Sequence, residues 1–194
     1  LERVEHYLDN NNIFVISGSV PPGFPLVNFI ELIKTIKKAG CRLIVDEAGD
    51  LMREALKFEP DFVKPNIFEL AELVGDEPTA DPDQVVHSAR KLLDMGAQAV
   101  CVSMGAEGAL FASKNEPEVL YVNCNPKIYD EGAVGTGDAM VGAIANSLDK
   151  KLSFVDMAKF TVATDRACAR LAGTEMATLK KVYEVYETLL VYTV

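Results

Sequence analysis

The stretch Ala133-Val134-Gly135-Thr136-Gly137-Asp138-Ala139-Met140-Val141-Gly142 decides how this chain is interpreted. Two glycines flank a threonine, an aspartate follows at once, and small or apolar residues then recur at helical spacing. The pattern predicts a tight turn that leads into a buried helix. Glycine permits positive φ angles and close approach of another group, and the first turn of a helix has free N–H groups with partial positive charge. We therefore expect an anion site at this turn.

Asp138 lies in the same turn and admits two interpretations. Its carboxylate can accept the proton of a hydroxyl that attacks a phosphoryl group. It can equally serve only as the N-cap of the helix. The residues Gly-Thr-Gly-Asp alone do not separate these alternatives.

Composition bounds the class of protein. With 49% hydrophobic residues, the 194-residue chain can bury a sizeable core, and we expect a single α/β domain over residues 1–194. The net charge of −10 argues against binding to nucleic acid or to an anionic membrane, since both need clustered Lys and Arg. No apolar run approaches the roughly 20 residues that span a bilayer. Four cysteines lie far apart among apolar or small neighbours, which favours a reduced, cytoplasmic protein.

Short apolar runs alternate with amphipathic segments along the chain. The apolar runs predict strands at 13–16, 42–46, 62–64, 99–103, 109–112 and 119–122. Helical spacing predicts helices at 1–11, 25–39, 51–58, 66–74, 83–95, 137–148, 153–172 and 179–191. This alternation predicts an α/β fold with a mainly parallel sheet and helices on both faces.

Polar residues directly follow several of the predicted strands. They are Ser17, Ser19, Asp46, Lys64, Asn66 and the segment 103–108. Because ligands bind at the carboxyl ends of parallel strands, we expect these residues at one edge of the sheet. The two common phosphate-binding fingerprints do not explain them: the chain has no Gly-x-x-x-x-Gly-Lys-Ser/Thr, and Met140 stands where a dinucleotide fingerprint has its third glycine.

Four motifs occur together in one order and spacing. They are Ser17-Gly18-Ser19-Val20-Pro21-Pro22-Gly23, Asn66-Ile67-Phe68-Glu69 after Val63-Lys64-Pro65, Ser103-Met104-Gly105-Ala106-Glu107-Gly108, and Gly135-Thr136-Gly137-Asp138. In this combination the chain resembles the ribokinase-like (PfkB) carbohydrate kinases across essentially its whole length. The resemblance implies a ribokinase-like, Rossmann-like three-layer fold and the transfer of a phosphoryl group from ATP to a sugar.

The resemblance implies a role for each residue of the glycine-rich turn. Asp138 would be the catalytic base, and the amides of Gly135, Thr136 and Gly137 would form the anion hole for the migrating phosphate. The helix N-terminus favours the ionised carboxylate, so the value of Asp138 lies mostly in its orientation.

The resemblance also implies an ATP and Mg²⁺ site. Asn66 and Glu69 would organise Mg²⁺ and phosphate, with Glu69 reaching the metal through water, in addition to forming a capping pair. Lys64 is either a contact to a nucleotide phosphate or an ordinary solvated lysine. The remaining residues of the ATP site would be Ser103, Gly105, Gly108 and Gly173, although a hairpin turn and a helix end account for the glycines equally well. The backbone of Gly132 and Val134 would hold a monovalent cation such as K⁺.

The Ser-Gly-Ser-x-Pro-Pro-Gly loop narrows the expected substrate. Within the family it is typical of kinases of phosphorylated hexoses, and Ser17 and Ser19, with Asp138, would bind the sugar. We expect a 1-phosphofructokinase, which converts fructose 1-phosphate to fructose 1,6-bisphosphate. The alternatives are a tagatose-6-phosphate kinase, a kinase of an unphosphorylated sugar or nucleoside, and a truncated, noncatalytic nucleotide-binding remnant.

Two departures from the family pattern stand out. The family tends to have Asp-Thr-Ser-Gly where this chain has Asp46-Glu47-Ala48-Gly49, so two hydroxyls are replaced by a charge. Family members also carry roughly a hundred further residues before the position of Leu1, including the lid strands. We therefore expect the lid strands to be absent, this chain to have weak activity, and a homodimer only in the full-length protein.

Overall fold

The computed structural model describes residues 2–21, 23–125, 127 and 134–194. Its strands are β1 (Ile13–Ser17), β2 (Arg42–Asp46), β3 (Phe62–Val63), β4 (Ala99–Ser103), β5 (Ala109–Ser113), β6 (Leu120–Cys124) and β7 (Leu189–Thr193). Its helices are α1 (Glu2–Glu5), α2 (Leu26–Lys38), α3 (Gly49–Leu56), α4 (Ile67–Val74), α5 (Pro82–Asp94), the 3₁₀ turn η1 (Gly105–Glu107), α6 (Thr136–Asp149), α7 (Phe154–Ala169) and α8 (Leu179–Tyr186). Within these ranges no helix is both long and apolar enough to cross a membrane.

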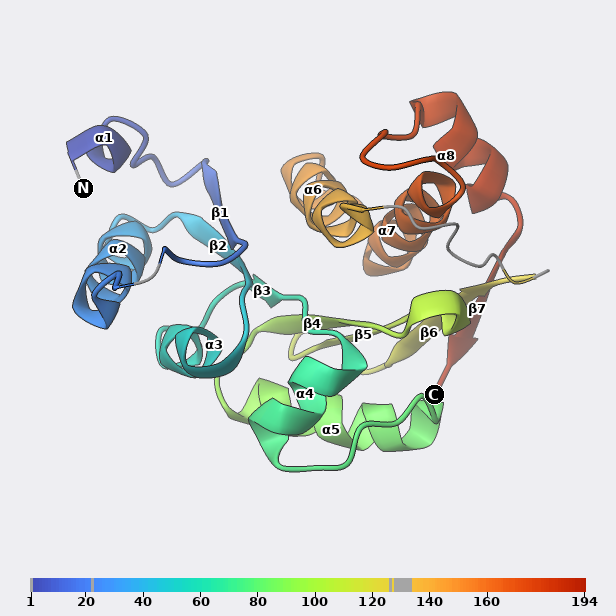
Figure 1. Cartoon of the computed structure of the whole chain (residues 1–194), viewed down its shortest axis with the longest axis horizontal. Coiled ribbons are helices and arrows are strands. Elements are labelled where there is room, and N and C mark those ends of the chain that lie inside the picture. The colour runs from blue at the N-terminus through green and yellow to red at the C-terminus, as the bar shows by residue number, and fades with distance from the viewer. Residues whose placement is uncertain (1, 22, 126, 128–133) are drawn as a thin grey trace.

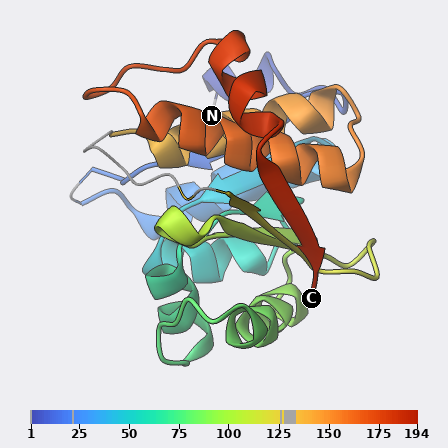
Figure 2. The same cartoon turned by 90° about the vertical axis from the view of Figure 1, so that its right-hand side faces the viewer.

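The strands form one sheet whose spatial order follows the chain from β1 to β7. Parallel crossovers are almost always right-handed, so strands added in sequence place their connecting helices on the same face. Accordingly α2, α3, α4 and α5 pack on one face, and α6, α7 and α8 cover the other, each layer with its own apolar core. Figures 1 and 2 show the sheet between these two layers. The predicted three-layer α/β fold is confirmed.

The sheet is mixed rather than mainly parallel as predicted, because its first half is parallel and its second half is antiparallel. Strands β1 to β4 pair in parallel, and β4 to β7 pair antiparallel. The antiparallel half begins with the predicted hairpin of β4 and β5, which η1 connects. The seven strands all belong to this sheet, and the described residues contain no separate layer of lid strands.

The prediction of a helix over 179–191 is wrong at its end. Helix α8 ends at Tyr186, and residues 189–193 form β7, which pairs with β6 at the sheet edge. The rings of Tyr121 and Tyr192 stack across this pair with centroids 6.0 Å apart. A run as short as Leu189–Thr193 has no clear period that separates a strand from a helix, and pairing with β6 decided the outcome.

The predicted helix over residues 1–11 is also too long. Helix α1 is confined to Glu2–Glu5, and a turn follows in which Asp9 Oδ1 accepts hydrogen bonds from the backbone and side-chain nitrogens of Asn11. Asp and Asn favour such side-chain turns over a continued helix. The other predicted elements differ from the structure by a few residues at their ends.

The parallel half brings four strand ends to one edge of the sheet. Ser17 pairs with Asp46 in the register of β1 and β2. Beyond β3, Asn66 forms an isolated parallel bridge with Ser103 at the end of β4. The polar residues that follow these strands therefore lie together, as expected.

We predict that Gly96→Ala destabilises the fold strongly. Gly96 has φ +136°, and a Cβ at this position would lie 2.0 Å from the carbonyl oxygen of Leu56. The free energy of unfolding should fall by roughly 2–4 kcal/mol, because both the backbone conformation and the neighbouring main chain oppose a side chain. Urea unfolding followed by circular dichroism measures this change. Gly142→Ala is the control: a Cβ there meets nothing within 4 Å, so stability should rise by about 0.5–1 kcal/mol. Equal stability of the two variants would contradict the packing described here.

Candidate functional site

The glycine-rich turn forms the start of α6. Gly135 is the N-cap residue, with φ 91°, and its carbonyl accepts the hydrogen bond of Ala139 N at 2.9 Å. No side chain caps this helix, so the interpretation of Asp138 as its N-cap is wrong. The turn leaves the first N–H groups of α6 available to an anion, and a left-handed φ at the N-cap favours glycine. Asp138 lies within this first turn, and its side chain is exposed.

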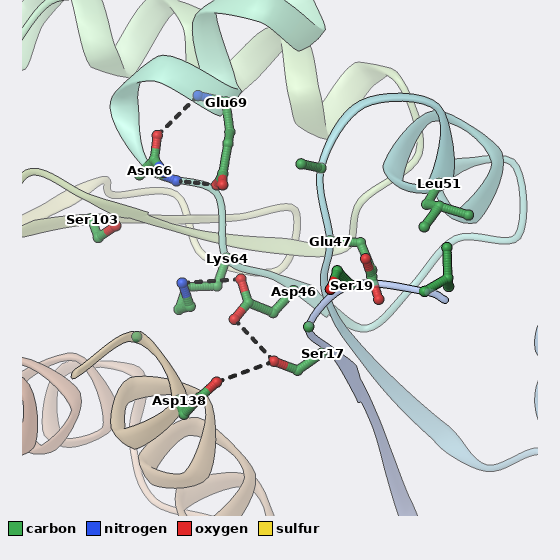
Figure 3. Close-up of a pocket in the computed structure, with 14 residues that line it drawn as sticks. Ser17, Ser19, Asp46, Glu47, Leu51, Lys64, Asn66, Glu69, Ser103 and Asp138 are labelled. Carbon is green, nitrogen blue, oxygen red and sulfur yellow. Dashed lines mark hydrogen bonds and ion pairs between the residues drawn. The ribbon is translucent and has the colours of Figure 1, made fainter. Parts of the chain in front are cut away.

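A row of polar contacts joins α6 to the edge of the sheet (Figure 3). The hydroxyl of Ser17 lies 3.4 Å from Asp138 Oδ1 and 3.3 Å from Asp46 Oδ2. On the other side, Asp46 Oδ1 lies 3.0 Å from Lys64 Nζ. A serine hydroxyl has one proton to donate, so Ser17 can satisfy only one of its two carboxylates at a time. Asp138 takes part in no ion pair among the described residues, and its contact to Ser17 uses only one of its two oxygens.

Lys64 is buried rather than solvated. It is 6% exposed, and its Nζ lies 3.6 Å from the place where a Cβ on Gly137 would stand. The ammonium group therefore reaches the first turn of α6 from the strand side. Of the two interpretations of Lys64, an ordinary solvated lysine is wrong.

Asn66 and Glu69 form the predicted capping box at the start of α4. Asn66 Oδ1 accepts hydrogen bonds from Phe68 N and Glu69 N, both at 2.9 Å, and Glu69 Oε2 accepts one from Asn66 N at 2.9 Å. The interlocked pair fixes the Glu69 carboxylate at the end of β3. The capping role of Asn66 and Glu69 is thus confirmed, and the role of these two residues toward Mg²⁺ remains a prediction.

Two adjoining cavities open at the carboxyl ends of the parallel strands. The large cavity has a volume of about 550 Å³ and the small cavity about 320 Å³. Asn66, Ser103 and Gly137 line both. The large cavity is further lined by Ser17, Gly18, Ser19, Val20, Asp46, Glu47, Ala48, Leu51, Lys64, Glu69 and Asp138. The small cavity is further lined by Ile67, Phe68, Met104, Gly105, Thr136, Met140, Asp165 and Arg166.

The two cavities differ in their chemistry. Serines and carboxylates dominate the large cavity, whereas apolar side chains, the start of α6 and one guanidinium line the small one. Arg166 is 3% exposed and donates to the neighbouring carboxylate of Asp165 through Nε at 2.7 Å. In the large cavity, burial raises the pKa of Glu47, and repulsion from Asp46 adds to this effect.

Not every predicted site residue reaches a cavity wall. Gly108 lines neither cavity; a Cβ there would lie 2.1 Å from the carbonyl oxygen of Val122, so this glycine lets η1 pack against β6. Gly173 also lines neither, and its carbonyl accepts a hydrogen bond from Val134 N at 2.8 Å. The other residue of the predicted monovalent-cation site, Gly132, lies outside the described residues.

Sequence reasoning missed three charged residues that line the cavities. Glu47 was noted only as a departure from the family pattern, and its burial follows from the packing of the 46–49 turn rather than from any motif. Asp165 and Arg166 are adjacent charged residues in the otherwise buried stretch of α7. Such a pair inside an apolar helix was a usable signal, because buried charges need a partner.

Comparison with known proteins finds relatives whose similarity extends over all the residues that line the two cavities. The model of the pfkB family carbohydrate kinases matches residues 1–179. The chain is 36% identical over 189 residues to ATP-dependent 6-phosphofructokinase isozyme 2 of Escherichia coli K12, and this alignment covers 96% of the chain and 60% of that relative. It is 31% identical over 163 residues to the 1-phosphofructokinase of Borreliella burgdorferi, which covers 84% of the chain and 52% of that relative.

A solved structure agrees with these sequence matches. Phosphofructokinase-2 from Escherichia coli in complex with potassium superposes with a TM-score of 0.86 at 34% identity, over 96% of this chain and 60% of that chain. The chain thus spans about half to three fifths of the length of these relatives. The family match includes every residue of the two cavities, and the chain belongs to the pfkB family of carbohydrate kinases.

Proposed function

We propose that this chain carries the catalytic centre of an ATP-dependent hexose-phosphate kinase of the 1-phosphofructokinase type. One observation supports this above all: Gly137 lines both cavities, Asp138 lines only the large one, and Thr136 lines only the small one. The first turn of α6 therefore lies between the two cavities, with the Asp138 carboxylate on the large cavity and main-chain N–H donors beside it. A phosphoryl group that moves from the small cavity to the large one would meet both the carboxylate and the donors.

The chemistry of the cavities supports one substrate in each. The large cavity, rich in hydroxyls and carboxylates, suits the sugar, because hydroxyl groups donate readily to such side chains. The small cavity, with Phe68, Met104 and Met140 beside the start of α6, suits a nucleotide, whose aromatic base packs against apolar side chains and whose phosphates are anionic.

The transfer then follows from the residues at the boundary. A hydroxyl of the sugar passes its proton to Asp138 as its oxygen bonds to the terminal phosphorus of ATP, and the bond from that phosphorus to the ADP oxygen breaks. The first N–H groups of α6 stabilise the charge on the transferring phosphoryl oxygens, and the buried ammonium of Lys64 adds to this.

The residues present fit Mg²⁺ held largely by the nucleotide. The described residues contain no group of three or more His, Cys, Asp or Glu placed to bind a metal. Mg²⁺ in kinases usually takes one or two carboxylates, keeps several waters and binds substrate phosphates. Glu69, fixed by its capping box, would hold the ion through water. When bound, Mg²⁺ supplies neutralisation of phosphate charge.

Three further properties belong to this proposal. The potassium in the Escherichia coli relative supports a K⁺ site near Val134. We expect the protein to act in the cytoplasm, in keeping with its buried, unpaired cysteines Cys41, Cys101, Cys124 and Cys168. We also expect a homodimer in the full-length protein, which analytical ultracentrifugation measures.

One relative is named a 6-phosphofructokinase and another a 1-phosphofructokinase, so the sugar on which this protein acts needs a direct test. Fructose 1-phosphate, fructose 6-phosphate and tagatose 6-phosphate should be compared by ADP release under single-turnover conditions with excess protein. We expect the highest rate with fructose 1-phosphate. If the protein binds ATP but releases ADP with none of these sugar phosphates, the alternative of a noncatalytic nucleotide-binding remnant is favoured.

We predict that Asp138→Asn lowers the rate of ADP release about 10²–10⁴-fold, because the amide cannot take the hydroxyl proton. The dissociation constant of ATP, measured by calorimetry, should stay the same, since Asp138 does not line the small cavity. Asp149→Asn makes the same charge change at the other end of α6, where the side chain is exposed, and should leave the rate unchanged. A rate that survives Asp138→Asn would refute the catalytic role.

We predict that Glu69→Gln keeps the capping contact of residue 69 and weakens its interaction with Mg²⁺. The glutamine oxygen can still accept from Asn66 N, so the free energy of unfolding should change by less than about 1 kcal/mol. The Mg²⁺ concentration that gives half-maximal rate should rise, because a negative charge is lost. Asn66→Ala removes both contacts to Asn66 Oδ1 and should cost about 1–2 kcal/mol of stability. An unchanged Mg²⁺ requirement in Glu69→Gln would leave Glu69 with the cap alone.

A further inference from the structure

Glu47 is a carboxylate in the large cavity that no described residue satisfies. It is 8% exposed and lines the cavity, and within the described part of the chain it makes neither a hydrogen bond nor an ion pair. The adjacent Asp46 differs, because Lys64 and Ser17 contact its two oxygens. The oxygens of Glu47 are not among the enclosed polar atoms that lack a partner, so they face the open cavity, and partial burial raises the pKa of the carboxyl. A side chain kept in this state is suited to a partner that arrives from outside.

The surroundings of Glu47 restrict what that partner is. The charged side chains that line the large cavity are Asp46, Glu47, Glu69 and Asp138, together with Lys64, which is paired with Asp46. At the Glu47 end of the cavity, the adjacent carboxylates of Asp46 and Glu47 repel a phosphate group. A metal held by protein side chains also lacks support, since the described residues offer no cluster of metal ligands. Neutral hydrogen-bond donors remain, and the hydroxyl groups of a sugar are such donors.

The position of Glu47 relative to the base supports the same ligand. In the view of Figure 3, Ser17 and Asp46 lie between Asp138 and Glu47, and Glu47 extends into the cavity from the 46–49 turn. A sugar whose reacting hydroxyl meets Asp138 would pass over Ser17 toward Glu47. The large cavity, about 550 Å³, has room for a hexose in this position.

We propose that Glu47 binds hydroxyl groups on the carbon chain of the acceptor sugar and thereby selects the sugar. The proposal rests on the proposed function, because it takes the acceptor to be a hexose phosphate. The acceptor's own phosphate points away from this wall, where carboxylates would repel it. The family tends to have uncharged hydroxyl side chains in the 46–49 turn. This chain would instead use the charged side chain of Glu47 to recognise its substrate.

The test is acceptor binding by Glu47→Gln, which keeps the shape of the side chain and removes its charge. Isothermal calorimetry on the 194-residue chain should show the dissociation constant of fructose 1-phosphate rising about tenfold to a hundredfold, the range expected for hydrogen bonds to a charged group. The dissociation constant of ATP should not change. The thermal midpoint should stay level or rise, because a partly desolvated charge beside Asp46 is lost. Glu31→Gln, on the exposed side of α2, is the matched control and should leave every value unchanged.

Deoxy analogues show whether the contact is made to hydroxyls. The 3-deoxy or the 4-deoxy analogue of fructose 1-phosphate should bind the wild-type chain at least about tenfold more weakly than the parent sugar, and Glu47→Gln should abolish most of that difference. Equal penalties in both proteins overturn the role of Glu47 alone, as does a lower thermal midpoint with unchanged sugar affinity. A wild-type chain that binds neither fructose 1-phosphate nor fructose 6-phosphate overturns the proposed function and the role of Glu47 together.

Discussion

The ion pair between Lys64 and Asp46 is the contact on which the site depends. Asp46 ends β2 and Lys64 directly follows the neighbouring parallel strand β3, and the pair brings a buried ammonium to the first turn of α6. A lysine that is 6% exposed would be costly without a carboxylate beside it. The same carboxylate also meets Ser17, which reaches Asp138. One pair thus connects the strand ends, the start of α6 and the exposed carboxylate of Asp138 in a single network.

The topology explains why these groups meet. Because β1 to β4 follow one another in parallel, the turns after them open at one edge, and their connecting helices occupy only one face. The other face is left to α6 and α7, which come from a distant part of the chain. Helix α6 can therefore direct its N-terminus toward the strand ends (Figure 1). The large and small cavities lie on either side of that N-terminus.

Local patterns predicted the parts of this arrangement that local physics determines. The 3.6-residue period placed α2 and α5, and the spacing of Asn66 and Glu69 predicted their capping box, because a cap forms within a single turn of chain. The burial of Lys64 was not predictable, since it depends on a carboxylate in another strand and on a helix far along the chain. Strand β7 was missed for a similar reason: only its pairing with β6 distinguishes it from a continued α8.

The charges at the site explain why the glycines of the turn are needed. Among the described residues that line the cavities, the cations are Lys64 and Arg166, and each is bound to an aspartate, Asp46 and Asp165 respectively. Neither presents a full uncompensated charge to an incoming polyphosphate. Under the proposed function, attraction for the transferring phosphate would then come largely from the main-chain N–H groups of α6. These groups are free because a glycine with positive φ, rather than a capping side chain, begins the helix. A serine or aspartate at Gly135 would occupy those donors and replace the proposed anion site with an ordinary helix cap.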